Sequence, residues 1–210
     1  LVSIDQVEPE ELISDDPDTL RLAEAMSEAV APMVGETERH CRIVSRVAGE
    51  VAEELALGAV SRLRCRIAGM LHDVGKIAVP GEILGKPGAL TPDERVLVQR
   101  HAEVGARMVR SMGGLADAAD AVLHHHERWD GLGYPTGLAG EAIPIEARII
   151  AAVDAWSAMI EPRVYGPALA PDEALDELVR CAATQFDPTV VGALQRVLDR
   201  PGLEVLEPVA

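Results

Sequence analysis

Leu71-His72-Asp73-Val74-Gly75-Lys76 ends an apolar run, and the interpretation of the whole chain depends on this stretch. Neighbouring residues on a helix point about 100° apart, so His72 and Asp73 cannot clasp one ion as an i, i+4 pair does. They can instead serve adjacent positions of a metal cluster, because an imidazole nitrogen suits a transition metal and a carboxylate can bridge two ions. The pair alone is more typical of an ordinary hydrogen-bonded helix end, and the rest of the chain changes that interpretation.

The residues that follow this pair favour a phosphate ligand. Gly75 allows close backbone approach, and the ammonium of Lys76 beside a metal site is a natural partner for a phosphate. Lys76 and Lys86 are the only lysines in a chain that otherwise uses arginine. We therefore expect Lys76 to supply a compact charge where a guanidinium would not fit.

Length and composition set the broad class of the protein. The chain has 210 residues, 48% of them hydrophobic, and a formal net charge of −16. This length and hydrophobic content predict one large domain with its own core. The acidic charge opposes non-specific binding to DNA or RNA. Because the sequence shows neither a membrane-spanning apolar run nor a signal-peptide pattern, we expect a cytoplasmic protein without a membrane segment.

The three cysteines, Cys41, Cys65 and Cys181, are odd in number and far apart in the sequence. None belongs to a Cys-x-x-Cys pair, which argues against a disulfide framework and against a zinc knuckle. We expect them to be small core residues.

Helical signals recur along the chain without strand-like alternation or internal repeats, so we predict an all-α fold. Residues 1–15 are acidic and irregular and begin with Leu, which indicates a linker or tail that follows an upstream domain. The folded domain is expected over 16–200, including an N-terminal helix over 16–34, and residues 201–210 form a C-terminal tail. Further helices are predicted over 36–58, over a segment that follows Gly58 and runs to Leu71, and over 91–108, 115–125, 146–159, 171–184 and 188–198. Loops are predicted over 77–90 and 129–144.

Other candidate metal ligands lie on faces that these helices should bury. Glu36 and His40 are four residues apart, which places a carboxylate and an imidazole on one helical face. His101 shares the predicted apolar face of helix 91–108 with Leu97 and Met108. Two further positions complete the set: the adjacent pair His125 and His126, and Asp154 on the buried side of helix 146–159.

Each candidate has a simpler interpretation. A single inward histidine is commonly a hydrogen-bonded core residue, and Glu36 with His40 can be a solvated helical pair. A buried carboxylate such as Asp154, however, costs several kcal/mol unless it is paired. Every histidine except His124 falls at one of these positions. This coincidence favours a multinuclear site of iron or manganese before zinc, because imidazoles and carboxylates mix there without thiolates.

Taken together, these stretches resemble the HD-GYP family of cyclic di-GMP phosphodiesterases, over a region from about Glu36 to Asp187-Pro188. The resemblance implies an HD-type helical core with additional C-terminal helices and a bi- or trinuclear metal centre. It also implies hydrolysis of cyclic di-GMP to linear pGpG and/or GMP. The matching motifs are His72 to Ile77, Ile83 to Gly88, Leu90-Thr91, His101, His125 to Gly131, Gly133-Tyr134-Pro135, and Arg148-Ile149 with Asp154.

The resemblance also implies roles for single residues. Asp73 would bridge two metals that activate water for attack on phosphorus, and Lys76 would stabilise the developing charge. Lys76, Tyr134 and Arg163 would contact the substrate, and Glu36 matches an extra carboxylate of the trinuclear members. The implied metal ligands are Glu36, His40, His72, Asp73, His101, His125, His126 and Asp154.

Three positions depart from the family pattern. Arg163-Val164-Tyr165-Gly166 stands where the family usually has Arg-Pro-Tyr-Lys, and Ser157 replaces a usual Asp. One alternative is therefore a catalytically weak sensor or binding module for cyclic di-GMP or a signalling partner. A second is an HD-type phosphohydrolase acting on another nucleotide. The partners that we expect are cyclic di-GMP, an upstream regulatory domain or a GGDEF-type protein, and a second copy in a homodimer.

Overall fold

A computed structural model describes residues 17–34, 37–161 and 168–201 of the chain. This part is helical, and its only β-type pairing is an isolated bridge between Ala182 and Phe186, so the predicted all-α class is confirmed. None of the described helices has the length and apolar character needed to cross a membrane.

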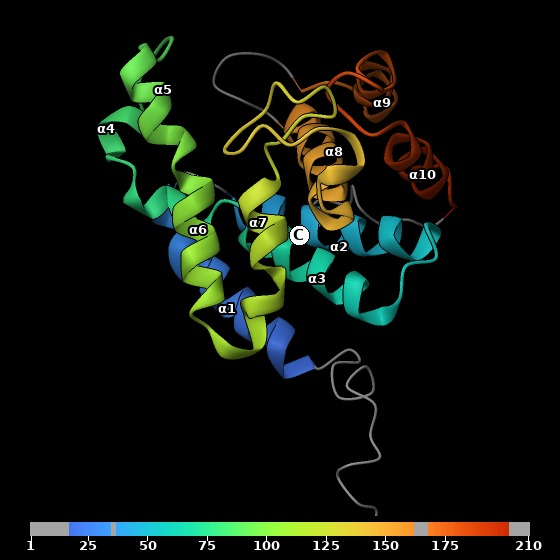
Figure 1. The fold of residues 1–210 in the computed structure, drawn as a ribbon, viewed down its shortest axis with the longest axis horizontal. Helices are drawn as coiled ribbons and strands as arrows, with labels where there is room; N and C mark the ends of the chain where they lie inside the picture. Colours follow the sequence, from blue (N-terminus) through green and yellow to red (C-terminus); the bar gives the residue numbers. More distant parts are fainter. Residues whose placement is uncertain (1–16, 35–36, 162–167, 202–210) are drawn as a thin grey trace, which may run out of the picture.

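The elements follow one another in an order that matches most of the predicted helices. Figure 1 shows α4 and α5 projecting at one corner of the molecule, with α9 and α10 on the opposite side. In chain order the helices are α1 (Pro17–Val34), α2 (Glu38–Glu54), α3 (Ala59–Leu71), α4 (Gly81–Leu84), α5 (Pro92–Gln99), α6 (His101–Arg110), α7 (Ala119–His124), α8 (Ile145–Ile160), α9 (Pro171–Arg180) and α10 (Pro188–Leu198), with the short 3₁₀ helices η2 (Val74–Ala78), η3 (Gly113–Ala118) and η4 (Gly140–Ala142) between them.

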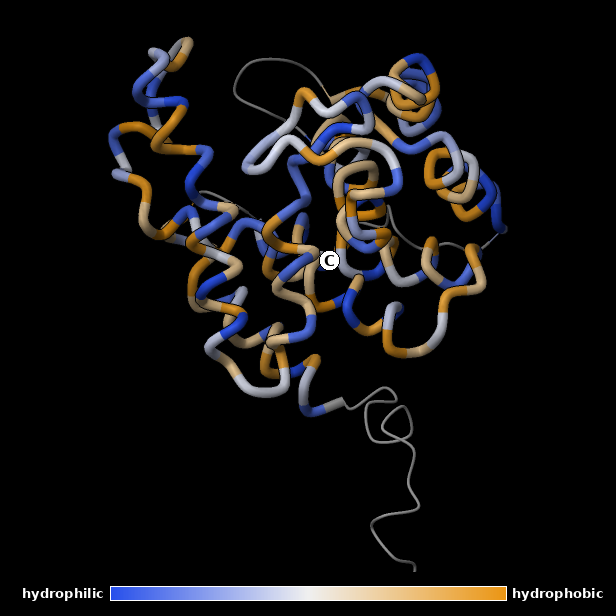
Figure 2. Tube along the Cα trace, in the orientation of Figure 1, coloured by the Kyte–Doolittle hydropathy of each residue, from blue (hydrophilic) through white to orange (hydrophobic). Residues whose placement is uncertain are grey.

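The core forms where α2, α3 and α8 pack together. Val44, Val47 and Val51 recur at helical spacing on α2 and are completely buried, as is Trp156 on α8. Apolar and polar residues alternate along the helices in Figure 2, as expected for amphipathic helices around a shared core. Cys41 and Cys65 belong to this core as predicted, whereas Cys181 is only half-buried.

Two glycines let backbones approach closely enough to assemble the site. A Cβ at Gly69 of α3 would lie 2.6 Å from the Cα of Ser45 on α2, so only glycine permits this helix contact. A Cβ at Gly75 of η2 would lie 2.0 Å from the carbonyl oxygen of His101. The first contact packs the C-terminal part of α3 against the middle of α2, and the second sets η2 against the start of α6.

The region 77–108 differs from the sequence prediction. The segment 77–90, predicted as a loop, contains the end of η2 and all of α4. The predicted capping box at Thr91 does start α5, but this helix stops at Gln99 and α6 begins at His101, with Arg100 (φ −63°, ψ −13°) between them. Leu97 is 39% exposed and His101 only 1%, so the two do not share a buried face.

Three helix ends were also predicted inaccurately. Helix α2 ends at Glu54 rather than at Gly58, because Ala56 adopts a left-handed conformation and Gly58 instead precedes α3 as its N-cap. The segment 115–125 begins as 3₁₀ helix, and α9 stops at Arg180, before the left-handed Ala183. The predicted loop 129–144 is confirmed apart from η4, and α1 and α10 lie where the sequence indicates.

Candidate metal centre

The ends of several helices bring the predicted ligands together. His40 comes from α2, the His72-Asp73 pair follows α3, and His101 begins α6. The predicted ligands among the described residues form two groups. Within each group, one potential metal-ligating atom of each residue lies within 4.8 Å of those of the others. Glu36 and Arg163 lie outside the described residues. The two groups are Asp73, His101, His125 and His126, and His40, His72 and Asp154.

Three histidines are held in the same orientation. The Nδ1 atoms of His72, His101 and His125 lie 3.0, 2.7 and 2.7 Å from the carbonyl oxygen of the residue three positions earlier. A carbonyl only accepts, so each Nδ1 carries a proton, and in a neutral imidazole the Nε2 atom then presents a lone pair. Backbone contacts of this kind fix the tautomer and ring orientation of a metal-binding histidine.

Those lone pairs converge on one another and on Asp73. His101 Nε2 lies 3.3 Å from His125 Nε2 and 3.2 Å from Asp73 Oδ1, so acceptors face acceptors. Within the described part of the chain, His72 Nε2 and Asp73 Oδ1 are buried without a hydrogen-bond partner. A buried acceptor without a donor is unfavourable by about 1–3 kcal/mol. A cation between these atoms removes that cost, so the residues present fit a metal centre.

Asp73 connects the two groups. Its Oδ1 faces His101 of the first group, and its Oδ2 lies 3.3 Å from Nε2 of His72 in the second. Asp154 Oδ1 lies 3.1 Å from His40 Nε2 and 3.7 Å from His72 Nε2. A carboxylate with one oxygen toward each group has the geometry of a bridging ligand.

The electrostatics put most of these groups in their metal-binding forms. Burial lowers the pKa of His125 well below its usual value and that of His126 to about 4, so both imidazoles are neutral at pH 7. Burial alone raises the pKa of Asp73 and of Asp154, but the histidines around them outweigh it and hold both pKa values well below the usual range.

His72 differs from His125 and His126 in the direction of its pKa shift. Burial alone lowers its pKa, but the negative charges of Asp73 and Asp154 outweigh that effect and hold the pKa well above its usual value. A positive charge is therefore favoured at this point between the two carboxylates. A proton on His72 and a metal ion at its Nε2 are alternative ways to supply it.

Lys76 and Tyr134 lie at the edge of the cluster. Lys76 Nζ is 2.6 Å from Asp73 Oδ2, so the ammonium is held beside the predicted bridging carboxylate. The Tyr134 ring is tilted by 31° against His126, with ring centroids 4.8 Å apart. Burial raises the pKa of the Tyr134 hydroxyl, which keeps it protonated. Both predicted substrate contacts therefore lie next to the predicted metal ligands.

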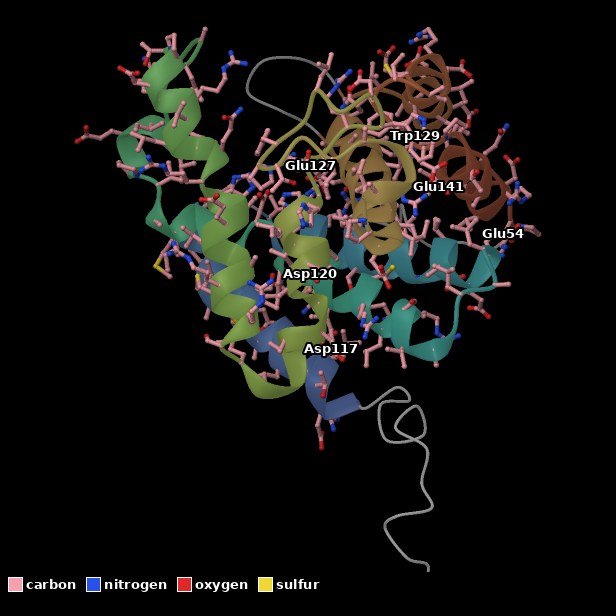
Figure 3. All side chains as sticks on the ribbon, viewed as in Figure 1. Glu54, Asp117, Asp120, Glu127, Trp129 and Glu141 are labelled. Carbon is pink, nitrogen blue, oxygen red and sulfur yellow. The ribbon has the colours of Figure 1, made fainter. Side chains whose placement is uncertain are left out.

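Glu127 holds the loop that carries Tyr134, and sequence reasoning assigned it no role. Its Oε1 accepts hydrogen bonds from the backbone N–H and the hydroxyl of Thr136, both at 2.7 Å, and Gly137 N–H donates at 3.1 Å to each carboxylate oxygen. Figure 3 shows Glu127 where α7 meets this loop. Inside the loop, a Cβ at Gly133 would lie 2.4 Å from Arg128 N, so the turn requires glycine.

The outer part of the same loop is tied to the turn between α9 and α10. Trp129 N–H donates to the carbonyl of Gln185 at 3.1 Å, and Asp130 N–H donates to the carbonyl of Thr184 at 2.8 Å. Figure 3 places Trp129 on the α9 side of the loop. The C-terminal helices therefore support the loop that presents Tyr134.

Comparisons with known proteins agree with this geometry. A family model described as HD domain matches residues 14–190. Over 173 residues the chain is 41% identical to the cyclic di-GMP phosphodiesterase response regulator RpfG of Xanthomonas campestris, covering 81% of this chain and 46% of that protein. Over 164 residues it is 38% identical to a cyclic di-GMP phosphodiesterase of Thermotoga maritima, and this match covers 77% of this chain and 45% of that protein. The chain thus spans less than half the length of these relatives.

A solved structure shows the same fold. The crystal structure of a cyclic GMP-AMP specific phosphodiesterase from V. cholerae superposes with a TM-score of 0.68 at 19% identity, covering 87% of this chain and 49% of that one. At this identity the likeness concerns the fold alone.

Proposed function

The chain belongs to the HD domain family, and from that premise we propose that it is a metal-dependent phosphodiesterase that hydrolyses cyclic di-GMP to pGpG and/or GMP. The observation that carries the proposal is the convergence of the buried Nε2 atoms of His72 and His101 on the carboxylate of Asp73, with His125 Nε2 beside them. The names of the relatives, at 38% and 41% identity, supply the substrate class.

The proposed metal centre uses the two described groups as two binding positions. Asp73, His101, His125 and His126 would hold one ion, and His40, His72 and Asp154 the other, with Asp73 shared. Ions in such positions polarise phosphoryl oxygens and lower the pKa of a water ligand. Iron or manganese is favoured over zinc because the donors are imidazoles and carboxylates. A third ion at Glu36 stays a prediction.

The chain's own residues define how the substrate is held. Lys76, fixed 2.6 Å from Asp73, places a positive charge where a phosphate would approach the centre. Tyr134, packed on His126 and supported by the loop around Glu127, forms a wall beside that position. Arg163 is proposed as a further phosphate contact on the strength of the resemblance.

Two alternatives have different grounds. A relative specific for 3'3'-cGAMP, 34% identical over 171 residues, favours a phosphodiesterase acting on another cyclic dinucleotide. The glycine at position 166 favours a module that binds cyclic di-GMP and turns it over weakly. An upstream regulatory domain, a GGDEF-type partner, a homodimer and a cytoplasmic location stay predictions.

The deciding experiment is a turnover assay on anaerobically purified protein loaded with Mn²⁺ or Fe²⁺. Cyclic di-GMP and 3'3'-cGAMP are offered separately and the products are resolved by chromatography. We expect faster release of pGpG or GMP from cyclic di-GMP, and none after His125→Ala. Preference for 3'3'-cGAMP would assign the other substrate, and binding without product would make the protein a sensor.

A further inference from the structure

His40 is anchored differently from the other buried histidines of the centre. His72, His101 and His125 each use a nearby backbone carbonyl, but His40 Nδ1 lies 3.0 Å from the hydroxyl of Ser157, a residue 117 positions away on α8. Ser157 is completely buried. The orientation of His40 therefore depends on a side chain from another helix.

Helix α8 contacts both ring nitrogens of His40. Asp154 Oδ1 lies 3.1 Å from Nε2, and Ser157, one turn later, lies beside Nδ1. One further turn along, Glu161 Oε1 lies 3.9 Å from the same Nδ1. The spacing of three residues puts Asp154 and Ser157 on one face of α8, and Glu161 follows directly after the helix ends at Ile160.

Glu161 adds a negative charge on the Nδ1 side. Its Oε1 is buried and has no hydrogen-bond partner within the described part of the chain, and its closest cationic contact there is Arg39 Nη1 at 3.6 Å. A carboxylate beside Nδ1 favours the tautomer with the proton on that nitrogen, which leaves the Nε2 lone pair directed toward Asp154 and His72.

We propose that Ser157, supported by Glu161, is a positioning residue for His40. Its hydroxyl accepts the Nδ1–H of His40 and so holds Nε2 ready for the ion that His40 shares with His72 and Asp154. The inference rests on the proposed metal centre and adds to it a residue outside the ligand set. Removal of such a supporting contact typically weakens metal binding by about 10- to 100-fold.

Ser157→Ala tests this inference with a readout that does not require turnover. Metal-free protein is titrated with Mn²⁺ by calorimetry, and we expect one of two binding events to weaken by about 10- to 100-fold while the other is unchanged. Ser157→Thr restores the hydroxyl and should recover most of the affinity. Ser45→Ala removes another buried serine, on α2, and should leave both events unchanged.

A spectroscopic measurement identifies the residue affected. In Zn²⁺-loaded protein, long-range ¹H–¹⁵N spectra report the protonated nitrogen of each histidine, and Ser157→Ala should broaden or shift only the His40 Nδ1–H signal. Glu161→Gln, which keeps the shape and removes the charge, should weaken the same binding event to a smaller extent.

Several outcomes would overturn the inference. Unchanged Mn²⁺ affinity in Ser157→Ala would do so, as would equal loss of both binding events together with a lower melting temperature of the metal-free protein, because the hydroxyl would then serve core packing. Wild-type protein that binds no metal would refute the proposed function instead. Two ions bound without hydrolysis would refute the activity alone.

Discussion

Glu127→Ala should loosen the loop that presents Tyr134. The Glu127 side chain is completely buried and accepts hydrogen bonds from two donors of Thr136 and from Gly137 N–H, so its carboxylate closes the loop that contains Gly133 and Tyr134. Removing the carboxylate leaves the loop ends without this common acceptor. Tyr134 would then be free to move from its position on His126.

The magnitude follows from the three donors. A hydrogen bond to a charged group contributes roughly 1.5–3 kcal/mol, but Thr136 and Gly137 are exposed, so water replaces much of what is lost. We expect the free energy of unfolding to fall by about 2–3 kcal/mol, which for a domain of this size lowers the melting temperature by about 4–12 °C. Glu127→Gln keeps one side-chain oxygen that can accept from Thr136 and Gly137. This change should lower the free energy of unfolding by about 1 kcal/mol.

Thermal unfolding and steady-state kinetics measure the two consequences separately. The KM for cyclic di-GMP should rise about tenfold, the equivalent of about 1.4 kcal/mol of lost substrate binding. Glu141→Ala is the matched control, because Glu141 is an exposed carboxylate farther along the same segment (Figure 3). If Glu127→Ala matched Glu141→Ala in melting temperature and in KM, the assigned role of Glu127 would be wrong.

Three further changes separate folding from chemistry. Lys76→Ala should keep the melting temperature within a few degrees while kcat falls by about 10², the scale of losing one transition-state charge stabiliser; a normal kcat would exclude that role. Gly75→Ala forces a Cβ against the His101 carbonyl and should lower the free energy of unfolding, measured in urea, by about 1–3 kcal/mol or more; an unchanged value would contradict the close contact. Glu36→Ala should remove about one metal ion per chain in elemental analysis, since a ligand mainly affects its own ion. An unchanged metal content would mean that Glu36 is a solvated residue.

The sequence predicted those parts of the fold that depend on local signals. The capping box at Thr91 and the Asp187-Pro188 pair specify helix starts through neighbouring residues, and both were confirmed. The break at Arg100 was missed because its determinants are distant in the chain. The start of α6 is held against η2 at Gly75, a contact that helical periodicity does not reveal.

The site was predictable in its residue types and less so in its arrangement. Inward histidines and carboxylates indicated the candidate ligands, and the structure brings every described one into the cluster. Their division into two groups around Asp73 depends on the packing of five helices, α2, α3, α6, α7 and α8. No sequence pattern indicated a supporting role for Glu127 or Ser157, because their contacts to Thr136 and His40 become visible only in three dimensions.

The most direct test of the proposed centre is hydrolysis of cyclic di-GMP measured while metal-free protein is titrated with Mn²⁺ under anaerobic conditions. Two ions held around a shared Asp73 predict that activity appears only as the second ion binds, at about two ions per chain. Asp73→Ala should then bind less metal and show no turnover. Full activity with fewer than two ions, or normal activity and metal content in Asp73→Ala, would contradict the proposed centre.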